Sequence, residues 1–192
     1  TLFPYTTLFR SGDLFPALIT DWRRQWRSDF PFYFVQLANF MESKKIQPDS
    51  EWAALREAQT KALKLDQVGM AVTIDIGLAD DIHPKNKQEV GRRLALVALA
   101  GSYGKNVSSS APVFQNYIIK GNKMELDFGQ KQDGFQIKGT TLKGFTIAGP
   151  DRVFYPAEAM VHDGKIILSS TEVPARSEER RVGKECSSMG FC

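Results

Sequence analysis

His83 is the residue best suited to acid–base chemistry in this sequence. It is one of two histidines among 192 residues and lies in the stretch ADDIHPKNKQEV, two residues after Asp81 and three after Asp80. An imidazole can take a proton from a serine hydroxyl and return it to a leaving group near neutral pH. An acidic partner holds the tautomer of such a histidine. The spacing leaves Asp80 and Asp81 as candidate acids, with Asp75 more distant, and the alternative that His83 is an idle turn residue.

A strand–helix–strand pattern precedes His83. The apolar runs FPFYFVQL (30–37) and GMAVTIDIG (69–77) are typical of strands buried on both faces. Between them, Ser50 is a suitable N-cap for a helix beginning at Glu51. This order predicts two parallel strands joined by a helical crossover. Functional groups gather at the carboxyl ends of such strands, which is where DIGLADDIH places His83.

Two polar residues follow the first predicted strand. Gln36 and Asn39 are therefore candidates for substrate binding at the same edge of the sheet. The alternative is that their side-chain amides serve as local hydrogen-bond partners of the backbone.

Other conspicuous side chains have structural interpretations. The helical spacing of Trp22, Trp26 and Trp52 favours packing in the core over sugar stacking. Arg92 and Arg93, on the helix that follows His83, are expected on a solvated face rather than at an anion site.

The second half of the chain has the pattern of β structure. From Val113 onward, short apolar runs alternate with turn signals, including Gly-Asn at 121–122 and Asp-Gly at 163–164, which suit tight hairpins. His162 precedes the second of these turns and is expected to be exposed there. The runs predict part of a β-sandwich with exposed edges.

Composition excludes several classes of protein. A net charge of +3 does not favour a nucleic-acid partner, and no apolar run is long enough to span a membrane. The only cysteines, Cys186 and Cys192, lie at the end of the chain, so we expect neither a disulfide framework nor a metal site. Residues 1–13 and 176–192 have the character of translated adapter sequence and are set aside.

Four stretches in order resemble the sialate O-acetylesterase family of the SGNH hydrolase superfamily. They are FPFYFVQLANF, EWAALREAQTKAL, GMAVTIDIG and DIHPKNKQEVGRRLA, and the resemblance runs from about Leu14 to Pro174. It implies a flavodoxin-like α/β hydrolase core with an accompanying β-domain. It also implies hydrolysis of acetyl esters on sialic acids through a serine nucleophile and an acyl-enzyme, with no cofactor. By position, His83 is the general base, Asp80 matches the acid of the superfamily, and Asp-Ile-His-Pro makes Asp81 part of the family motif.

The nucleophile of that family has no counterpart in this sequence. No serine with the expected glycine and asparagine context precedes Leu14. We therefore expect an α/β fold comprising the C-terminal part of the hydrolase domain at 14–104 and a β-rich segment at 105–175, inactive alone. The expected substrate is an acetylated carbohydrate. The alternatives are an acetylxylan-type esterase and a non-catalytic carbohydrate-binding module. By family analogy, the protein is expected to be periplasmic or secreted.

Overall fold

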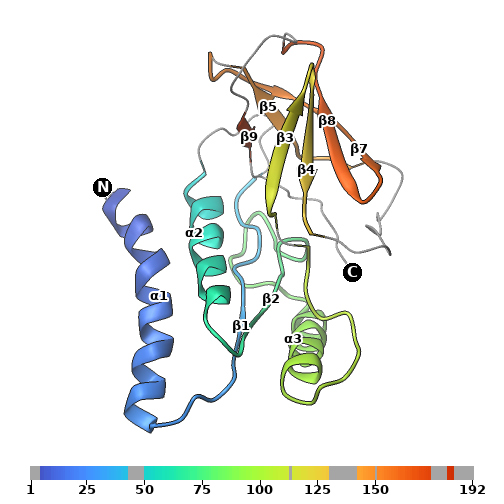
Figure 1. Cartoon of the computed structure of the whole chain (residues 1–192). Helices are drawn as coiled ribbons and strands as arrows, with labels where there is room; N and C mark the ends of the chain where they lie inside the picture. Colours follow the sequence, from blue (N-terminus) through green and yellow to red (C-terminus); the bar gives the residue numbers. More distant parts are fainter. Residues whose placement is uncertain are drawn as a thin grey trace. The chain divides into compact units, whose positions relative to one another are not determined.

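In the computed structural model, helices alternate with two strands in the first half of the chain, and the described elements after α3 are all strands (Figure 1). It describes residues 5–42, 50–112, 114–129, 142–149, 151–173 and 181–183. The chain divides into two units. Unit 1 consists of Thr1–Met41 and Glu51–Ser110, and unit 2 of Glu42–Ser50 and Ala111–Cys192. The division after Ser110 lies slightly beyond residue 105, where we expected the β-rich segment to begin.

Unit 1 contains the predicted strand–helix–strand arrangement. Strand β1 (Phe32–Val35) pairs in parallel with β2 (Val68–Ala71), and Phe34 lies opposite Met70. Helix α2 (Glu51–Thr60) lies between the two strands in sequence and continues into the 3-10 helix η1 (Lys61–Lys64). The apolar runs therefore predicted the parallel pair and the helix between its strands.

From Arg10 onward, helix α1 (Tyr5–Trp26) packs one face on this core and exposes much of the other. Ile19 is fully buried and shares a cluster with Phe34 and Met70. The predicted core packing of the first two tryptophans is wrong at the helix end, where Trp26 is 69% exposed and Trp22 is 43% exposed. Their rings stack on each other instead, with ring centroids 6.3 Å apart. Because α1 begins at Tyr5, it includes much of segment 1–13, whose origin as adapter sequence stays a prediction.

Strand β2 ends earlier than the apolar run predicted. The strand stops at Ala71, although the run continues to Gly77. The Thr73 hydroxyl donates a 2.7 Å hydrogen bond to the carbonyl of Gln36, and Ile76 N–H donates to the Thr73 carbonyl at 3.2 Å. These bonds turn the chain out of the ladder. The next regular element is α3 (Lys87–Gly101).

Unit 2 is built from antiparallel strands. Its described part has a four-stranded sheet in the order β3 (Asn116–Lys120), β4 (Lys123–Asp127), β8 (Lys165–Ser169) and β7 (Glu158–His162). A second sheet has the order β6 (Phe154–Pro156), β5 (Thr146–Ala148) and β9 (Arg181–Gly183). Both predicted hairpins are confirmed: Gly-Asn joins β3 to β4, and Asp-Gly joins β7 to β8. The predicted strand at 135–139 lies outside the described residues.

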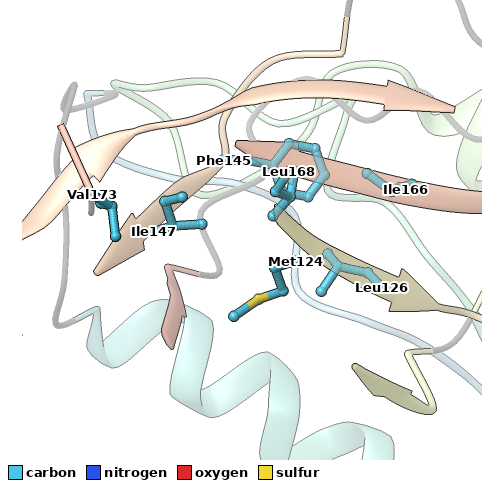
Figure 2. Packing of buried hydrophobic residues seen from close by; sticks show 7 residues of the cluster. All are labelled: Met124, Leu126, Phe145, Ile147, Ile166, Leu168 and Val173. Atoms are coloured by element: carbon cyan, nitrogen blue, oxygen red, sulfur yellow. The ribbon is translucent and has the colours of Figure 1, made fainter. Parts of the chain in front are cut away.

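One hydrophobic cluster contains residues of both sheets of unit 2 (Figure 2). The four-stranded sheet contributes alternate residues of β4 and β8, and Phe145 and Ile147 come from the region of β5. The cluster consists of Met124, Leu126, Phe145, Ile147, Ile166, Leu168 and Val173. Alternation along each strand turns one face of the larger sheet toward this core, as expected for antiparallel sheets. The chain as a whole is a mixed α/β protein.

Candidate active site

His83 lies in the connection between β2 and α3, on the carboxyl side of a parallel strand. Its side chain is 81% exposed. The connection begins after Ala71 and ends where Asn86 caps α3, with the Asn86 side chain accepting a 3.1 Å hydrogen bond from Glu89 N–H. His83 therefore follows β2 in the chain, as expected, but an irregular segment after Ala71, rather than the strand itself, carries the imidazole.

The carboxylate beside His83 belongs to Asp81. Its Oδ1 lies 3.3 Å from His83 Nδ1 and also accepts the backbone N–H of His83 at 2.8 Å. That N–H is the main reason why the pKa of Asp81 is lower than usual, and the imidazole acts in the same direction. One carboxylate oxygen thus contacts both the backbone and the ring of the same histidine, which leaves Nε2 on the side of the ring away from the acid.

The other two candidate acids have different surroundings. Asp80 is exposed, and it makes no hydrogen bond or ion pair within the part of the chain that the structure describes. Asp75 is largely buried, and both of its oxygens face Arg93, at 2.5 Å and 2.8 Å. The structure therefore brings Asp81 to His83 and does not bring Asp75 there.

Arg93 is a structural centre of this region that the sequence interpretation missed. Its side chain is only 11% exposed, so the predicted solvated position is wrong for this residue. The guanidinium donates to both oxygens of Asp75, to the carbonyl of Val72 at 2.8 Å, and to Glu89 at 2.7 Å. The hydrogen bonds that Arg93 donates to Asp75 are the main cause of the raised pKa of Arg93. The sequence did contain a signal for this pair. Arg93 falls in register with the apolar face of its helix, and Asp75 follows the preceding strand.

Glu89 joins the first turn of α3 to two arginines. Its carboxylate accepts hydrogen bonds from Arg92 at 2.7 Å and from Arg93 at 2.7 Å. These bonds, with that of Arg92 first, lower the pKa of Glu89 from 4.5 to about 2. Arg92 is half exposed, as predicted. The carboxylate near the start of α3 is also favoured by the helix dipole.

Gln36 directs its amide away from the histidine segment. The residue is buried, and its Nε2 donates to the carbonyl of Arg56 at 3.1 Å and to the Thr60 hydroxyl at 3.2 Å, both on α2. The observed bonds therefore correspond to the alternative of a local hydrogen-bond partner. Substrate binding by Gln36 stays a prediction.

Asn39 contacts the histidine segment directly. Its Oδ1 accepts a 2.8 Å hydrogen bond from Gly77 N–H, and Met41 N–H donates to the Ala79 carbonyl at 3.1 Å. The backbones approach so closely that a Cβ at Gly77 would lie 2.0 Å from the Asn39 carbonyl oxygen. Asn39 thus holds the segment that leads to His83, and its predicted contact with substrate remains untested.

This arrangement suits proton transfer. An exposed imidazole with a carboxylate at Nδ1 can accept a proton at Nε2 from a hydroxyl. Within the described ranges, no hydroxyl or thiol side chain is hydrogen-bonded to His83, and no group of three or more acidic, histidine or cysteine side chains is arranged to hold a metal ion. None of the helices described combines the length and hydrophobicity that a membrane crossing requires.

Several similar proteins are named as acetylesterases. No family model matches the chain. Sialate O-acetylesterase of Homo sapiens is 36% identical over 153 residues, which cover 70% of this chain and 29% of the relative. The Mus musculus protein of that name is 38% identical over 119 residues, which cover 52% of this chain and 22% of the relative. The chain therefore spans less than a third of the length of these relatives.

A solved structure extends the similarity to three dimensions. The crystal structure of a carbohydrate acetylesterase from Xanthomonas citri matches with a TM-score of 0.80 and 42% sequence identity. The match covers 86% of this chain and 39% of that one. It includes the majority of both the helical and the β-rich parts of the sequence.

Proposed function

Because this chain belongs to the sialate O-acetylesterase family, we propose that it carries the general base of a carbohydrate O-acetylesterase. The single observation that supports this most directly is that His83, paired with Asp81, lies on a segment that follows the carboxyl end of a parallel strand and is anchored by Asn39 and Arg93. In sheets of this kind, ligands bind at that edge.

In the proposed reaction, His83 Nε2 removes the proton of a serine hydroxyl while the serine oxygen attacks the acetyl carbonyl carbon. The imidazolium then gives that proton to the sugar oxygen as its bond to the acetyl group breaks. Water, deprotonated by His83, attacks the acetyl-enzyme, acetate leaves, and the proton returns to the serine oxygen. The family resemblance implies that this serine lies upstream in sequence, so we propose that the chain alone is inactive.

We assign the orienting role to Asp81. Its carboxylate contacts Nδ1 and can hold the tautomer in which Nε2 is free to accept a proton. Asp80, which matches the superfamily position, is the alternative and is exposed in the described structure. Replacing each aspartate by asparagine separates the two roles. Only the loss of the orienting acid should lower the turnover number, by about a hundredfold or more.

The finer features of the fold are also proposals. We propose that β1 and β2 are part of a flavodoxin-like doubly wound sheet, since each is flanked by helix and together they form a parallel pair. The two sheets of unit 2 contribute to one buried cluster, which supports their assignment to a β-sandwich. Residues 105–175 then form the β-domain that accompanies the hydrolase.

The substrate is an O-acetylated carbohydrate, and we favour acetylated sialic acid because the mammalian relatives carry that name. The Xanthomonas citri protein is named only as a carbohydrate acetylesterase, a name that is equally compatible with acetylated polysaccharide, our second candidate. We extend the family analogy to the compartment and propose a periplasmic or secreted protein.

The test uses a chimera in which this chain replaces the matching region of the Xanthomonas citri acetylesterase. Acetate release is measured from O-acetylated sialic acid and from acetylated xylan, with the isolated chain alongside. We expect turnover by the chimera and none by the chain alone. A folded chimera that binds either carbohydrate but releases no acetate would overturn the esterase assignment and favour a binding module. Circular dichroism and thermal unfolding establish that the chimera is folded.

A further inference from the structure

The segment that carries His83 begins where β2 ends. The position of this segment must therefore be fixed by contacts other than the hydrogen bonds of the sheet. The ladder ends at Ala71, and His83 follows only after an irregular stretch. A general base must be held within a fraction of an ångström of its productive position relative to the proton donor. An irregular stretch of this length needs anchors in order to meet that demand.

Arg93 provides an anchor at the beginning of the segment. Its Nη1 donates to the Val72 carbonyl at 2.8 Å, one residue after the ladder ends. Its Nη2 donates to Asp75 Oδ2 at 2.8 Å, and Nη1 contacts Asp75 Oδ1. One guanidinium on α3 therefore holds both the backbone and a side chain of the segment. The side chains of Arg93 and Asp75 are each 11% exposed, which limits screening by solvent.

Two further contacts hold the same stretch from the side of β1. The Thr73 hydroxyl binds the Gln36 carbonyl, and Asn39 binds Gly77 N–H. Glu89, which itself follows the Asn86 cap, fixes the Arg93 side chain through Nε at 2.7 Å. The guanidinium is thus restrained by an acid on its own helix while it holds the acid on the segment.

We propose that Arg93 and Asp75 are positioning residues for His83, which set the path of the segment as it leaves β2. The catalytic meaning of this inference rests on the proposed function, whereas its geometric content does not. The planar guanidinium fork is what the site requires, since it holds two carboxylate oxygens and a carbonyl at once. A lysine retains the charge but lacks the fork. Asp75 has no role as the orienting acid, because Arg93 occupies both of its oxygens.

The test measures backbone order in the isolated chain by ¹⁵N relaxation. In the wild type we expect order parameters near 0.85 for the Gly77 and His83 amides, the value of a rigid backbone. In Arg93→Lys and in Asp75→Asn these should fall below about 0.6, while Met70 in β2 keeps its value. Asp21→Asn is the matched control, since Asp21 pairs with Arg24 on the exposed surface of α1.

The same variants are then placed in the chimera. We expect the turnover number to fall tenfold to a hundredfold with KM changed less than twofold, because misplacement of the base affects proton transfer rather than binding. Unchanged order at Gly77 and His83 in both variants would overturn the inference. So would an equal loss of order in β2, which indicates a general structural role. If the chimera stays active with His83→Ala, the proposed function is wrong. The relaxation data would still test whether Arg93 and Asp75 fix the path of the segment.

Discussion

The two histidines of this chain have nearly the same immediate partner. His83 Nδ1 lies 3.3 Å from Asp81, and His162 Nδ1 lies 3.2 Å from Asp163. Both imidazoles are exposed, at 81% and 66% of the side chain. Neither the distance nor the exposure therefore distinguishes a candidate base from a turn residue.

The surroundings of the two pairs differ. His162 ends β7 beside a two-residue hairpin turn, and Asp163 is 88% exposed with a φ of 49°. Asp81 also accepts the backbone N–H of its histidine, and the segment that leads to it is held by Arg93 and Asn39. The difference teaches that anchoring of the neighbouring backbone, rather than a histidine–aspartate distance, identifies the site.

Replacing each histidine by alanine is the strongest test of this comparison. In the chimera, His83→Ala should lower the turnover number by about a thousandfold or more, because the general base is lost. His162→Ala should leave it within twofold. Rates of acetate release at saturating substrate measure both effects. Equal losses would mean that the anchored backbone does not mark the functional histidine.

Removal of the main anchor should have the next largest effect. Arg93→Met leaves Asp75 as an uncompensated, largely buried carboxylate and should lower the free energy of unfolding by about 3 kcal/mol. Arg24→Met removes the exposed partner of Asp21 and should leave the urea midpoint unchanged within error. Urea denaturation followed by circular dichroism measures both. A similar midpoint for the two variants would contradict the assigned importance of Arg93.

The glycines near the two histidines provide a smaller contrast. Gly77→Ala places a Cβ 2.0 Å from the Asn39 carbonyl oxygen, so backbone must move, at a cost of about 2 kcal/mol. Gly164→Ala meets open space, but its φ of 70° costs about 1 kcal/mol. The shift in denaturation midpoint gives each cost. Amide chemical shifts of the His83 segment should change only in Gly77→Ala, and their constancy there would refute the close approach.

The pH dependence of the Asp81 contact is the smallest expected effect. The pKa of Asp81 is lower in the folded chain than the ordinary 3.8, chiefly because His83 N–H binds the carboxylate. The contact therefore stabilises the segment above about pH 4 and is lost as pH falls through the lowered pKa. The His83 amide resonance, followed from pH 6 to pH 2, should report this loss. Asp81→Asn should abolish the titration of that resonance, and a persistent titration would assign it to another group.

Sequence patterns predicted the framework of the site well. Continuous apolar runs bounded by polar segments give buried parallel strands, and this placed β1, α2 and β2 in the right order. Turn residues at 121–122 and 163–164 predicted the hairpins. Two-residue hairpin turns favour Asp-Gly because such residues adopt positive φ readily, and Asp163 and Gly164 both do so. The location of His83 beyond β2 followed from the same pattern.

Tertiary contacts account for what the sequence did not reveal. The apolar run to Gly77 has the composition of a strand, but the ladder ends at Ala71, and Thr73 and Asp75 instead bind Gln36, just after β1, and Arg93 on α3. A helical arginine such as Arg93 is usually solvated, and burial becomes favourable here because the fold brings Asp75 and the Val72 carbonyl to its guanidinium. Trp26 fits the apolar face of α1 but lies beyond its buried middle.

Contacts between residues 39–41 and 77–79 have a consequence for interpreting natural and laboratory variants of this protein. A change at Asn39 displaces Gly77, and with it the path toward the imidazole. Such a variant would lose turnover in an assay whether or not the Asn39 side chain touches the carbohydrate. Crystallography of the variant with a bound ligand, rather than kinetics, is the means of telling these two causes apart.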